Sequence, residues 1–358
     1  MLLPVFNEAD RLTQCLQSLI DQPEEIAEIL VIDGGSTDGT QSLVRDFSVR
    51  DPRVRLIDAS PVPDSWIGKA WGLYFGLENS NPGCQWILCV DADVHVAKVL
   101  TRSLLAHARR TRVAVFSIAA RQRVSDKGDA LFHPAMLTTL VYRYGIPGKA
   151  TRNPAWVQAN GQCFFARRDT LLATQAFRAA QASFCDDVTA ARHMAAHGIP
   201  VGFYKSAGLV HTSMYSTWRE TWRNWPRSLP MKDRYSGWWE ALALLEILLI
   251  QALPLSLFVA LLSLGMGMGS KMVEINGFLV LIRLGVLVGT YHSYDRPPWT
   301  LALAGCRSAC GDENFRQCIP PHPNMARSLL YPRKRQSLSA RARNKIISFF
   351  VYLHLSNL

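Results

Sequence analysis

The sequence predicts an α/β domain with a mostly parallel sheet and helices on both faces, followed by an apolar helical region. Short apolar runs alternate with helical stretches over the first two hundred residues, as in a parallel sheet with crossover helices. The 358 residues are 49% hydrophobic and 19% charged. That balance fits a soluble domain joined to a short membrane part, so we assign residues 1–215 to the α/β domain.

The first elements of this domain are short apolar runs and the helices between them. Asp33 and Asp91 each follow directly after one of these buried runs. Because ligands of such sheets bind beyond the carboxyl ends of the strands, both aspartates mark the expected site. The strands are expected at residues 29–32, 86–90 and 113–118, and helices at residues 11–20 and 41–47.

Aromatic and basic side chains form two stripes after Tyr215. Spacings of i, i+4, i+7 for the tryptophans and i, i+4, i+8 for the arginines place each stripe on one face of a helix within residues 216–240. A helix at the lipid headgroups has this composition, although a helix packed on the domain with solvated arginines fits equally well. The stripes are Trp218, Trp222 and Trp225, and Arg219, Arg223 and Arg227.

Two apolar runs follow within residues 241–293. The run at residues 247–268 is long enough to span a bilayer, and a second run at residues 275–291 is interrupted by Arg283. We predict a membrane hairpin with both ends on one side; a re-entrant second segment and a soluble helical hairpin are the alternatives. Arg283 needs a partner in lipid, and Glu246 is a candidate.

Residues 294–358 are expected to form a basic, irregular tail. From Arg296 to Leu358 there are 10 Lys/Arg and 2 Asp/Glu, which supply most of the net charge of +11. Basicity confined to a tail favours contact with anionic lipid and argues against a nucleic-acid partner. Its cysteines match no standard zinc spacing. One hypothesis for this tail is a frameshifted coding end.

The α/β domain is expected on the cytoplasmic side of the membrane. No secretory signal opens the chain, because the first residues have no basic region and too short an apolar run. The cysteines of the domain show no pairing pattern and resemble small buried residues of a reducing compartment. Since Met1 falls inside the first strand, we also expect the true start to lie upstream.

The segment Asp91-Ala92-Asp93 carries the strongest chemical signal. Carboxylates at i and i+2 of an extended chain point to the same side. Such a pair can hold a hard divalent cation, Mg²⁺ or Mn²⁺, and the cation can bind a diphosphate. Asp-x-Asp alone is common on surface loops, but its position after a buried strand favours a site.

Three segments together resemble glycosyltransferase family 2 of the GT-A fold: Pro4-Val5-Phe6-Asn7-Glu8, Asp33 to Thr40, and Asp91-Ala92-Asp93. The resemblance covers residues 1–225 and implies a nucleotide-sugar donor, usually a UDP-sugar. It implies that Asp33 contacts the base, Asp91 the ribose or metal, and Asp93 the metal. The donor-binding residues implied are Pro4, Asn7, Glu8, Asp33, Lys69, Asp91 and Ala92.

A fourth segment, Phe184 to Arg192, resembles the family's Glu-Asp segment at a helix start, with Asp186 in the Glu position. The resemblance implies that Asp187 is the general base that deprotonates an acceptor hydroxyl as its oxygen attacks the anomeric carbon. The metal would stabilise the departing diphosphate, and one direct displacement inverts the configuration. The alternative is that both aspartates merely cap a helix.

Further segments resemble carotenoid and hopanoid glycosyltransferases. Residues 66–71 contain Lys69, a cation expected near the diphosphate. Asn160-Gly161-Gln162 and the segment around Trp225 resemble parts of these enzymes near the acceptor. His211 would complete the metal shell, although a satisfied structural histidine fits as well.

The expected function is inverting, metal-dependent transfer of a sugar from UDP-hexose to a hydroxyl of a membrane lipid, a carotenoid or other terpenoid. Hopanoids, sphingolipids and polyprenyl phosphates are alternative acceptors. The Gln-x-x-Arg-Trp motif of processive polysaccharide synthases is absent from the sequence. An alternative of another class is a catalytically inactive membrane protein that binds nucleotide sugar.

Overall fold

The computed structural model describes residues 1–23, 25–124, 129–213, 217, 219–220, 238–295 and 298. The chain divides into two units, Met1–Ala309 and Cys310–Leu358, and all described residues lie in the first. Most of the expected interfacial helix region of residues 216–240 and most of the expected tail lie outside the described residues.

The domain is built on a mixed sheet that contains eight strands in the described part of the chain. The pairs β1–β2, β2–β3, β1–β4 and β6–β10 are parallel, whereas β9 runs antiparallel between β4 and β6, and β8 is an antiparallel edge. The predicted mostly parallel sheet is therefore confirmed. The spatial order is β3 (Val54–Asp58), β2 (Ile29–Asp33), β1 (Leu2–Val5), β4 (Trp86–Cys89), β9 (Phe164–Arg167), β6 (Val115–Ala119), β10 (Val201–Lys205) and β8 (Lys149–Thr151).

A second, three-stranded sheet lies next to the site. Its strands are β5 (Val94–Val96), β11 (Val210–Thr212) and β7 (Arg121–Gln122). The middle strand β11 pairs antiparallel with β5 and parallel with β7. Because β5 begins directly after Asp93, this small sheet fixes the chain on one side of the acidic segment.

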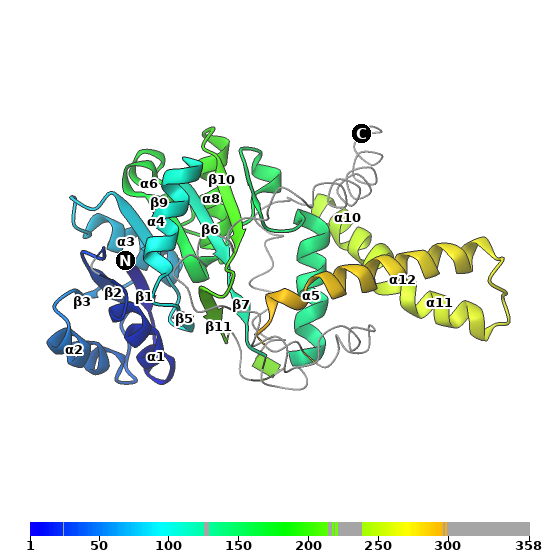
Figure 1. The fold of residues 1–358 in the computed structure, drawn as a ribbon, viewed down its shortest axis with the longest axis horizontal. Helices are drawn as coiled ribbons and strands as arrows, with labels where there is room; N and C mark the ends of the chain where they lie inside the picture. Colours follow the sequence, from blue (N-terminus) through cyan, green and yellow to red (C-terminus); the bar gives the residue numbers. More distant parts are fainter. Residues whose placement is uncertain are drawn as a thin grey trace. The chain divides into compact units, whose positions relative to one another are not determined.

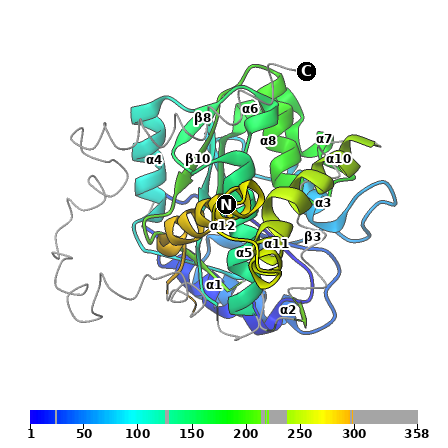
Figure 2. The same cartoon turned by 90° about the vertical axis from the view of Figure 1, so that its right-hand side faces the viewer.

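Helices cover both faces of the large sheet (Figures 1 and 2). One apolar core joins the sheet to α1, α2 and α4, and the other joins it to α3, α6, α7 and α8. This two-layer covering is what the strand–helix alternation predicts. The bounds are α1 (Ala9–Ile20), α2 (Thr40–Arg50), α3 (Gly68–Glu78), α4 (Leu100–Thr111), α6 (Arg168–Thr174), α7 (Ala176–Ala179) and α8 (Asp186–Ala196).

The central strands supply both cores because their side chains alternate between the two faces. In β2, Ile29 and Val31 belong to the core under α1, and Leu30 and Ile32 to the core under α3. All five residues of β2 are buried, as expected for a parallel strand covered on both sides. This rigid packing fixes Asp33, its last residue, at the edge of the sheet.

The C-terminal part of the described chain consists of helices joined by short turns. Helix α11 packs beside α12, and α12 also contacts α5 (Figure 1). Within residues 238–295, no ion pair joins Arg283 to its expected partner Glu246. The elements are α5 (Asp129–Tyr144), α10 (Trp238–Ile247), a π-helical turn η3 (Leu248–Ala252), α11 (Leu253–Ser263), α12 (Lys271–Gly289) and the turn η4 (Tyr291–Ser293).

One helix of the described chain is long and apolar enough to cross a membrane. It runs from Lys271 to Ser293, with a mean hydropathy of 1.8, and only 6% of its apolar window is buried. Leu253–Ser263 is apolar but shorter. Large exposed side chains such as Phe278 and Leu281 point away from the protein, which is unusual for a soluble core helix.

Two residues assigned to the irregular tail are in fact docked on the domain. Tyr294 is 2% exposed, and its hydroxyl lies 3.0 Å from His133 Nδ1. The Asp295 N–H donates to Gln122 O at 3.1 Å. The ordered chain therefore extends past the expected boundary at residue 294, because backbone pairing with β7 continues after η4.

Close packing of α3 on the sheet depends on Gly76. A Cβ at this position would lie 2.8 Å from Ile32 Cδ1 and 3.2 Å from Leu2 Cδ2. We expect Gly76→Val to lower the free energy of unfolding by about 1–3 kcal/mol through overpacking. Gly68→Val, in the same helix but with nothing within 4 Å, is the control. Equal thermal unfolding midpoints for both variants would contradict this account.

Candidate active site

A cleft of ≈ 590 Å³ opens where the chain leaves β1, β2 and β4. It lies at the carboxyl edge of the parallel strands, as expected for this sheet type. Five of the predicted donor-binding residues and the predicted metal ligand Asp93 line it. These six residues are Pro4, Glu8, Lys69, Asp91, Ala92 and Asp93.

Two other predicted donor-binding residues hold the loops of the cleft and are not part of its lining. Asn7 adopts a positive φ of 55°; its N–H donates to Ser36 Oγ, and its Oδ1 accepts the Thr37 N–H. Asp33 is fully buried, and its Oδ2 accepts the N–H groups of Gly35 and Ser36 at 3.0 Å. The structure therefore gives both residues a loop-forming role.

Asp33 nevertheless keeps one acceptor free. Its Oδ2 also accepts a bond from Gln41 Nε2 at 2.7 Å, whereas Oδ1 is buried without a partner among the described residues. Buried carboxylate oxygens are rarely left unpaired, because desolvation is costly. The neighbours Ile32 and Gly34 line the cleft, whereas Asp33 itself is not among the lining residues.

Asp93 is held by a series of hydrogen bonds that begins at Asn160, in the predicted segment Asn160-Gly161-Gln162. Asn160 Nδ2 donates to Gln162 Oε1 at 2.8 Å, and Gln162 Nε2 donates to Thr212 Oγ1 at 3.2 Å. Thr212 Oγ1 donates in turn to Asp93 Oδ2 at 2.9 Å. Each group in this series donates to the next, and the last hydrogen bond fixes the position of one oxygen of Asp93.

This series of hydrogen bonds changes the interpretation of Asn160-Gly161-Gln162, which was expected to contact the acceptor. Gln162 is 1% exposed, and its side-chain amide is used by Asn160 and Thr212. Its side chain is therefore not available to an acceptor in this structure. The segment, which includes the short helix η2 (Gly161–Cys163), instead supports the acidic residues of the site.

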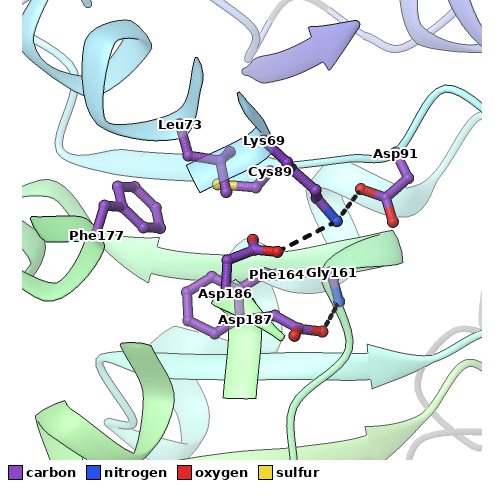
Figure 3. A pocket seen from close by; sticks show the side chains of 9 residues that line it. All are labelled: Lys69, Leu73, Cys89, Asp91, Gly161, Phe164, Phe177, Asp186 and Asp187. Carbon is purple, nitrogen blue, oxygen red and sulfur yellow. Dashed lines mark hydrogen bonds and ion pairs between the residues drawn. The ribbon is translucent and has the colours of Figure 1, made fainter. Parts of the chain in front are cut away.

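Lys69 lies between the acidic residues of two different segments (Figure 3). Its Nζ is 2.7 Å from Asp91 Oδ1 and 3.8 Å from Asp186 Oδ1. Asp186 is 4% exposed, and its Oδ2 has no partner among the described residues. A single ammonium thus balances carboxylates that would otherwise repel each other across the sheet edge.

Asp187 is fixed by backbone donors at the start of α8. Its Oδ2 accepts the N–H of Gly161, and its Oδ1 accepts the N–H of Val188 at 2.8 Å. A Cβ at Gly161 would lie 2.7 Å from Lys69 Nζ and 3.4 Å from Asp187 Oδ2. Glycine at this position therefore lets the backbone approach the charged cluster.

Burial shifts the pKa values of the acidic groups in the cluster. Burial, reinforced by the nearby charge of Asp91, raises the pKa of Asp93 to about 6. Burial raises the pKa of Asp186 to about 7, against the opposing attraction of Lys69, and also raises the pKa of Asp187. Burial acts to lower the pKa of Lys69, but the three carboxylates together raise it well above its usual value.

His211 does not support its predicted role as a metal ligand. Its Nδ1 lies 2.6 Å from Asp295 Oδ1, and its Nε2 lies 2.9 Å from Gly208 O. Both ring nitrogens are therefore occupied. Because neighbouring residues of a strand point to opposite faces, it is Thr212 that reaches Asp93. The predicted acceptor residue Trp225 lies outside the described residues.

Some site residues were missed by the sequence analysis. Arg11, on the first turns of α1, lines the cleft and pairs with Glu220 at 3.0 Å. Its position three residues after Glu8 places both on one helical side, a signal that the motif search did not use. Thr212 carries no sequence signal, since a lone threonine in a strand is common.

Asp91 and Asp93 fit a divalent metal by the chemistry of their oxygens. Mg²⁺ is usually held by one or two carboxylates, with waters and substrate phosphates completing its shell. Among the described residues, no group of three or more His, Cys, Asp or Glu is gathered for a metal. The two carboxylates thus suit a metal that arrives with a phosphate ligand.

The raised pKa of Asp186 predicts a pH-dependent stability. Between its ordinary 3.8 and about 7, the folded state binds a proton that the unfolded state does not, so rising pH lowers the free energy of unfolding. Asp186→Asn should remove this loss. We expect the variant to melt several degrees above the wild type at pH 8, since ~1 kcal/mol corresponds to roughly 2–4 °C, and equally at pH 5.

Exposed Asp46, on α2, provides the control for this measurement. Asp46→Asn should leave the melting temperature nearly unchanged, because substitutions on the exposed surface usually change the free energy of unfolding by no more than about 0.5 kcal/mol. A lower melting temperature for Asp186→Asn than for the wild type at pH 8 would contradict the destabilising role of this buried charge.

Comparison with known proteins supports an enzyme family for the first half of the chain. Residues 1–172 match the model of glycosyl transferase family 2. Glycosyltransferase AglE of Haloferax volcanii is 30% identical over 97 residues, 26% of this chain and 31% of the relative. Lipopolysaccharide core biosynthesis glycosyltransferase LpsC of Rhizobium meliloti is 37% identical over 99 residues, 28% of this chain and 32% of the relative.

Among solved structures, the mannosyltransferase PcManGT from Pyrobaculum calidifontis, in complex with GDP-Man and Mn²⁺, superposes with a TM-score of 0.48 at 16% identity, over 92% of this chain and 83% of that one. The chain spans about a third of the length of the curated relatives it matches. The part of the chain that matches the glycosyl transferase family 2 model, residues 1–172, contains β1 to β9 and the Asp91-Ala92-Asp93 segment.

Proposed function

We propose that this protein is an inverting, metal-dependent glycosyltransferase that moves a sugar from a nucleotide-sugar donor, a UDP-hexose, to a hydroxyl of a membrane lipid. The observation that carries the proposal is the position of Asp187. Two backbone N–H groups fix it beside Lys69, which also contacts Asp91 at the cleft. The candidate base Asp187 and the candidate donor-site residue Asp91 therefore both lie beside the ammonium group of Lys69.

The cleft residues divide naturally between the parts of the donor. Asp91 and Asp93 would hold Mg²⁺ or Mn²⁺, which when bound supplies positive charge to the leaving diphosphate. Lys69 supplies a further cation next to Asp91. Asp33 lies between Ile32 and Gly34, which line the cleft, and its unpaired Oδ1 would accept an N–H group of the base when the donor binds.

Asp187 is suited to act as the general base. Burial raises its pKa, which makes its carboxylate a stronger base than an exposed aspartate. It takes the proton of the acceptor hydroxyl as that oxygen bonds to the anomeric carbon, and the electron pair of the broken bond leaves with the diphosphate. A direct displacement of this kind inverts the anomeric configuration.

Helices α11 and α12 suggest that the acceptor comes from a membrane. Both helices expose large apolar side chains, among them Leu257, Val259, Phe278 and Leu281. Such an apolar surface is stable when lipid covers it. We propose a GT-A domain at residues 1–215, an interfacial helix region at 216–240, a membrane hairpin at 241–293 and, after the docked residues Tyr294 and Asp295, a basic tail, with the domain on the cytoplasmic side.

Within lipid acceptors, we favour a carotenoid or another terpenoid. The support is the resemblance of residues 66–71 and 160–162 to carotenoid and hopanoid enzymes. In the structure, the first segment begins α3 and forms an aromatic cluster: the Trp66 and Tyr74 rings lie 4.9 Å apart. Hopanoids, sphingolipids and polyprenyl phosphates are the competing acceptors, which lipid extracts of cells with and without the gene would distinguish.

Asp187→Asn is expected to lower the rate of sugar transfer by at least ~10²-fold, the usual contribution of a general base. The affinity for UDP, measured by calorimetry, should stay within about twofold, because a general base acts on the acceptor hydroxyl and not on the nucleotide. The matched control is Asp169→Asn, since Asp169 also lies in the first turn of a helix, α6, where it pairs with Arg167. If Asp187 is only a helix cap, both variants lose stability alike and neither loses activity.

Membrane insertion is tested on α12. Phe278→Lys combined with Leu281→Lys should reduce the protein retained in membranes after alkaline carbonate extraction, because each central charge costs ~2.5–3.5 kcal/mol in lipid. Val49→Lys is the control: Val49 is 88% exposed but lies on α2, far along the chain. Equal retention of the double variant and the control would exclude α12 as a membrane anchor.

A further inference from the structure

The segment that leaves the apolar helix α12 is anchored to the small sheet beside the site. Tyr294 pairs in parallel with Gln122 of β7, and the Asp295 N–H donates to Gln122 O. On the other side of β7, the Arg123 N–H donates to Thr212 O at 2.8 Å. β7 therefore lies between β11 and the chain after α12, and it pairs with both.

The side chain of Asp295 reaches past β7 to β11 itself. Its Oδ1 lies 2.6 Å from His211 Nδ1, and its Oδ2 lies 3.6 Å from Arg123. The other nitrogen of His211 contacts Gly208 O. The side chains of His211 and Asp295 are 26% and 16% exposed, so their contact is largely shielded from solvent.

His211 is followed directly by Thr212, the hydroxyl partner of Asp93. The two side chains point to opposite faces of β11. A contact that fixes the position of His211 therefore also fixes the backbone that carries Thr212. β11 has three residues, of which Val210 is fully buried in the core and His211 is half-buried. The buried Val210, the pairing with β5 and β7, and the contact of His211 with Asp295 together determine where the Thr212 hydroxyl lies.

We propose that His211 and Asp295 form a clamp that positions Thr212, and through it Asp93, so that the chain leaving α12 is part of the site. This rests on the proposed function of Asp93 in binding metal and donor. His211 is a positioning residue in this account and contacts neither metal nor donor. The apolar helix is thereby connected to the acidic cleft through six consecutive residues, Thr290 to Asp295.

The test is a double-mutant cycle on the full chain in detergent, with Mn²⁺ affinity read by electron paramagnetic resonance in saturating UDP. Thr212→Val should weaken Mn²⁺ binding roughly tenfold, as loss of a partner of a metal ligand usually does. Asp295→Ala should weaken it roughly threefold in the wild-type background and not at all in the Thr212→Val background. The control is Glu274→Ala, which breaks the pair with Lys271 at the other end of α12.

Hydrogen exchange supplies a second readout that needs no metal. Asp295→Ala should speed amide exchange in β11 and leave exchange in β1 and β2 unchanged, whereas Glu274→Ala should change neither. Unchanged amide exchange in β11 of Asp295→Ala would overturn the clamp. So would a roughly threefold loss of Mn²⁺ affinity on adding Asp295→Ala to the Thr212→Val variant, because the two substitutions would then act independently. A wild-type protein that fails to bind Mn²⁺ with UDP would instead overturn the proposed function, and with it the link from clamp to site.

Discussion

The site depends on one charge balance, the ammonium of Lys69 among carboxylates from two distant segments. Asp91 follows β4, and Asp186 begins α8, yet both face the same Nζ. Without this cation, carboxylates at the edge of one sheet would repel each other and would bind protons instead of ligands. The balance also explains why Gly161 comes so close: only a residue without a side chain leaves room for Lys69 there.

Support for the acidic residues comes from neutral groups. Backbone N–H groups hold Asp187, and a threonine hydroxyl backed by a buried amide holds Asp93. Neutral donors orient a carboxylate without cancelling its charge, so the oxygens that they leave free keep their affinity for a cation or a proton. The antiparallel β9 and the small sheet, both absent from the sequence prediction, are the elements that bring these donors into place.

The apolar helices obey a different constraint. The α/β domain buries its apolar side chains in two cores, whereas α12 leaves most of its surface uncovered. The hydrophobic effect makes such exposure costly in water, and lipid is the environment that removes the cost. Docking of Tyr294 and Asp295 on β7 joins this helix to the domain next to Thr212. The uncovered apolar helix and the packed α/β domain are therefore connected at this short strand.

Apolar periodicity and local motifs encode secondary structure directly, so they were enough to predict the α/β class, the strand ends at Asp33 and Asp91, and the helix start at Asp186. They also pointed to the acidic residues that line or border the cleft. The contacts of each side chain depend on the folded arrangement and could not be predicted in this way. Gln162 and Asn7 turned out to support loops and carboxylates, and His211 turned away from Asp93 toward Asp295. Thr212, which no local pattern distinguishes, became the partner of Asp93 because β11 pairs with β5 across more than a hundred residues of sequence, a contact that depends on the whole fold.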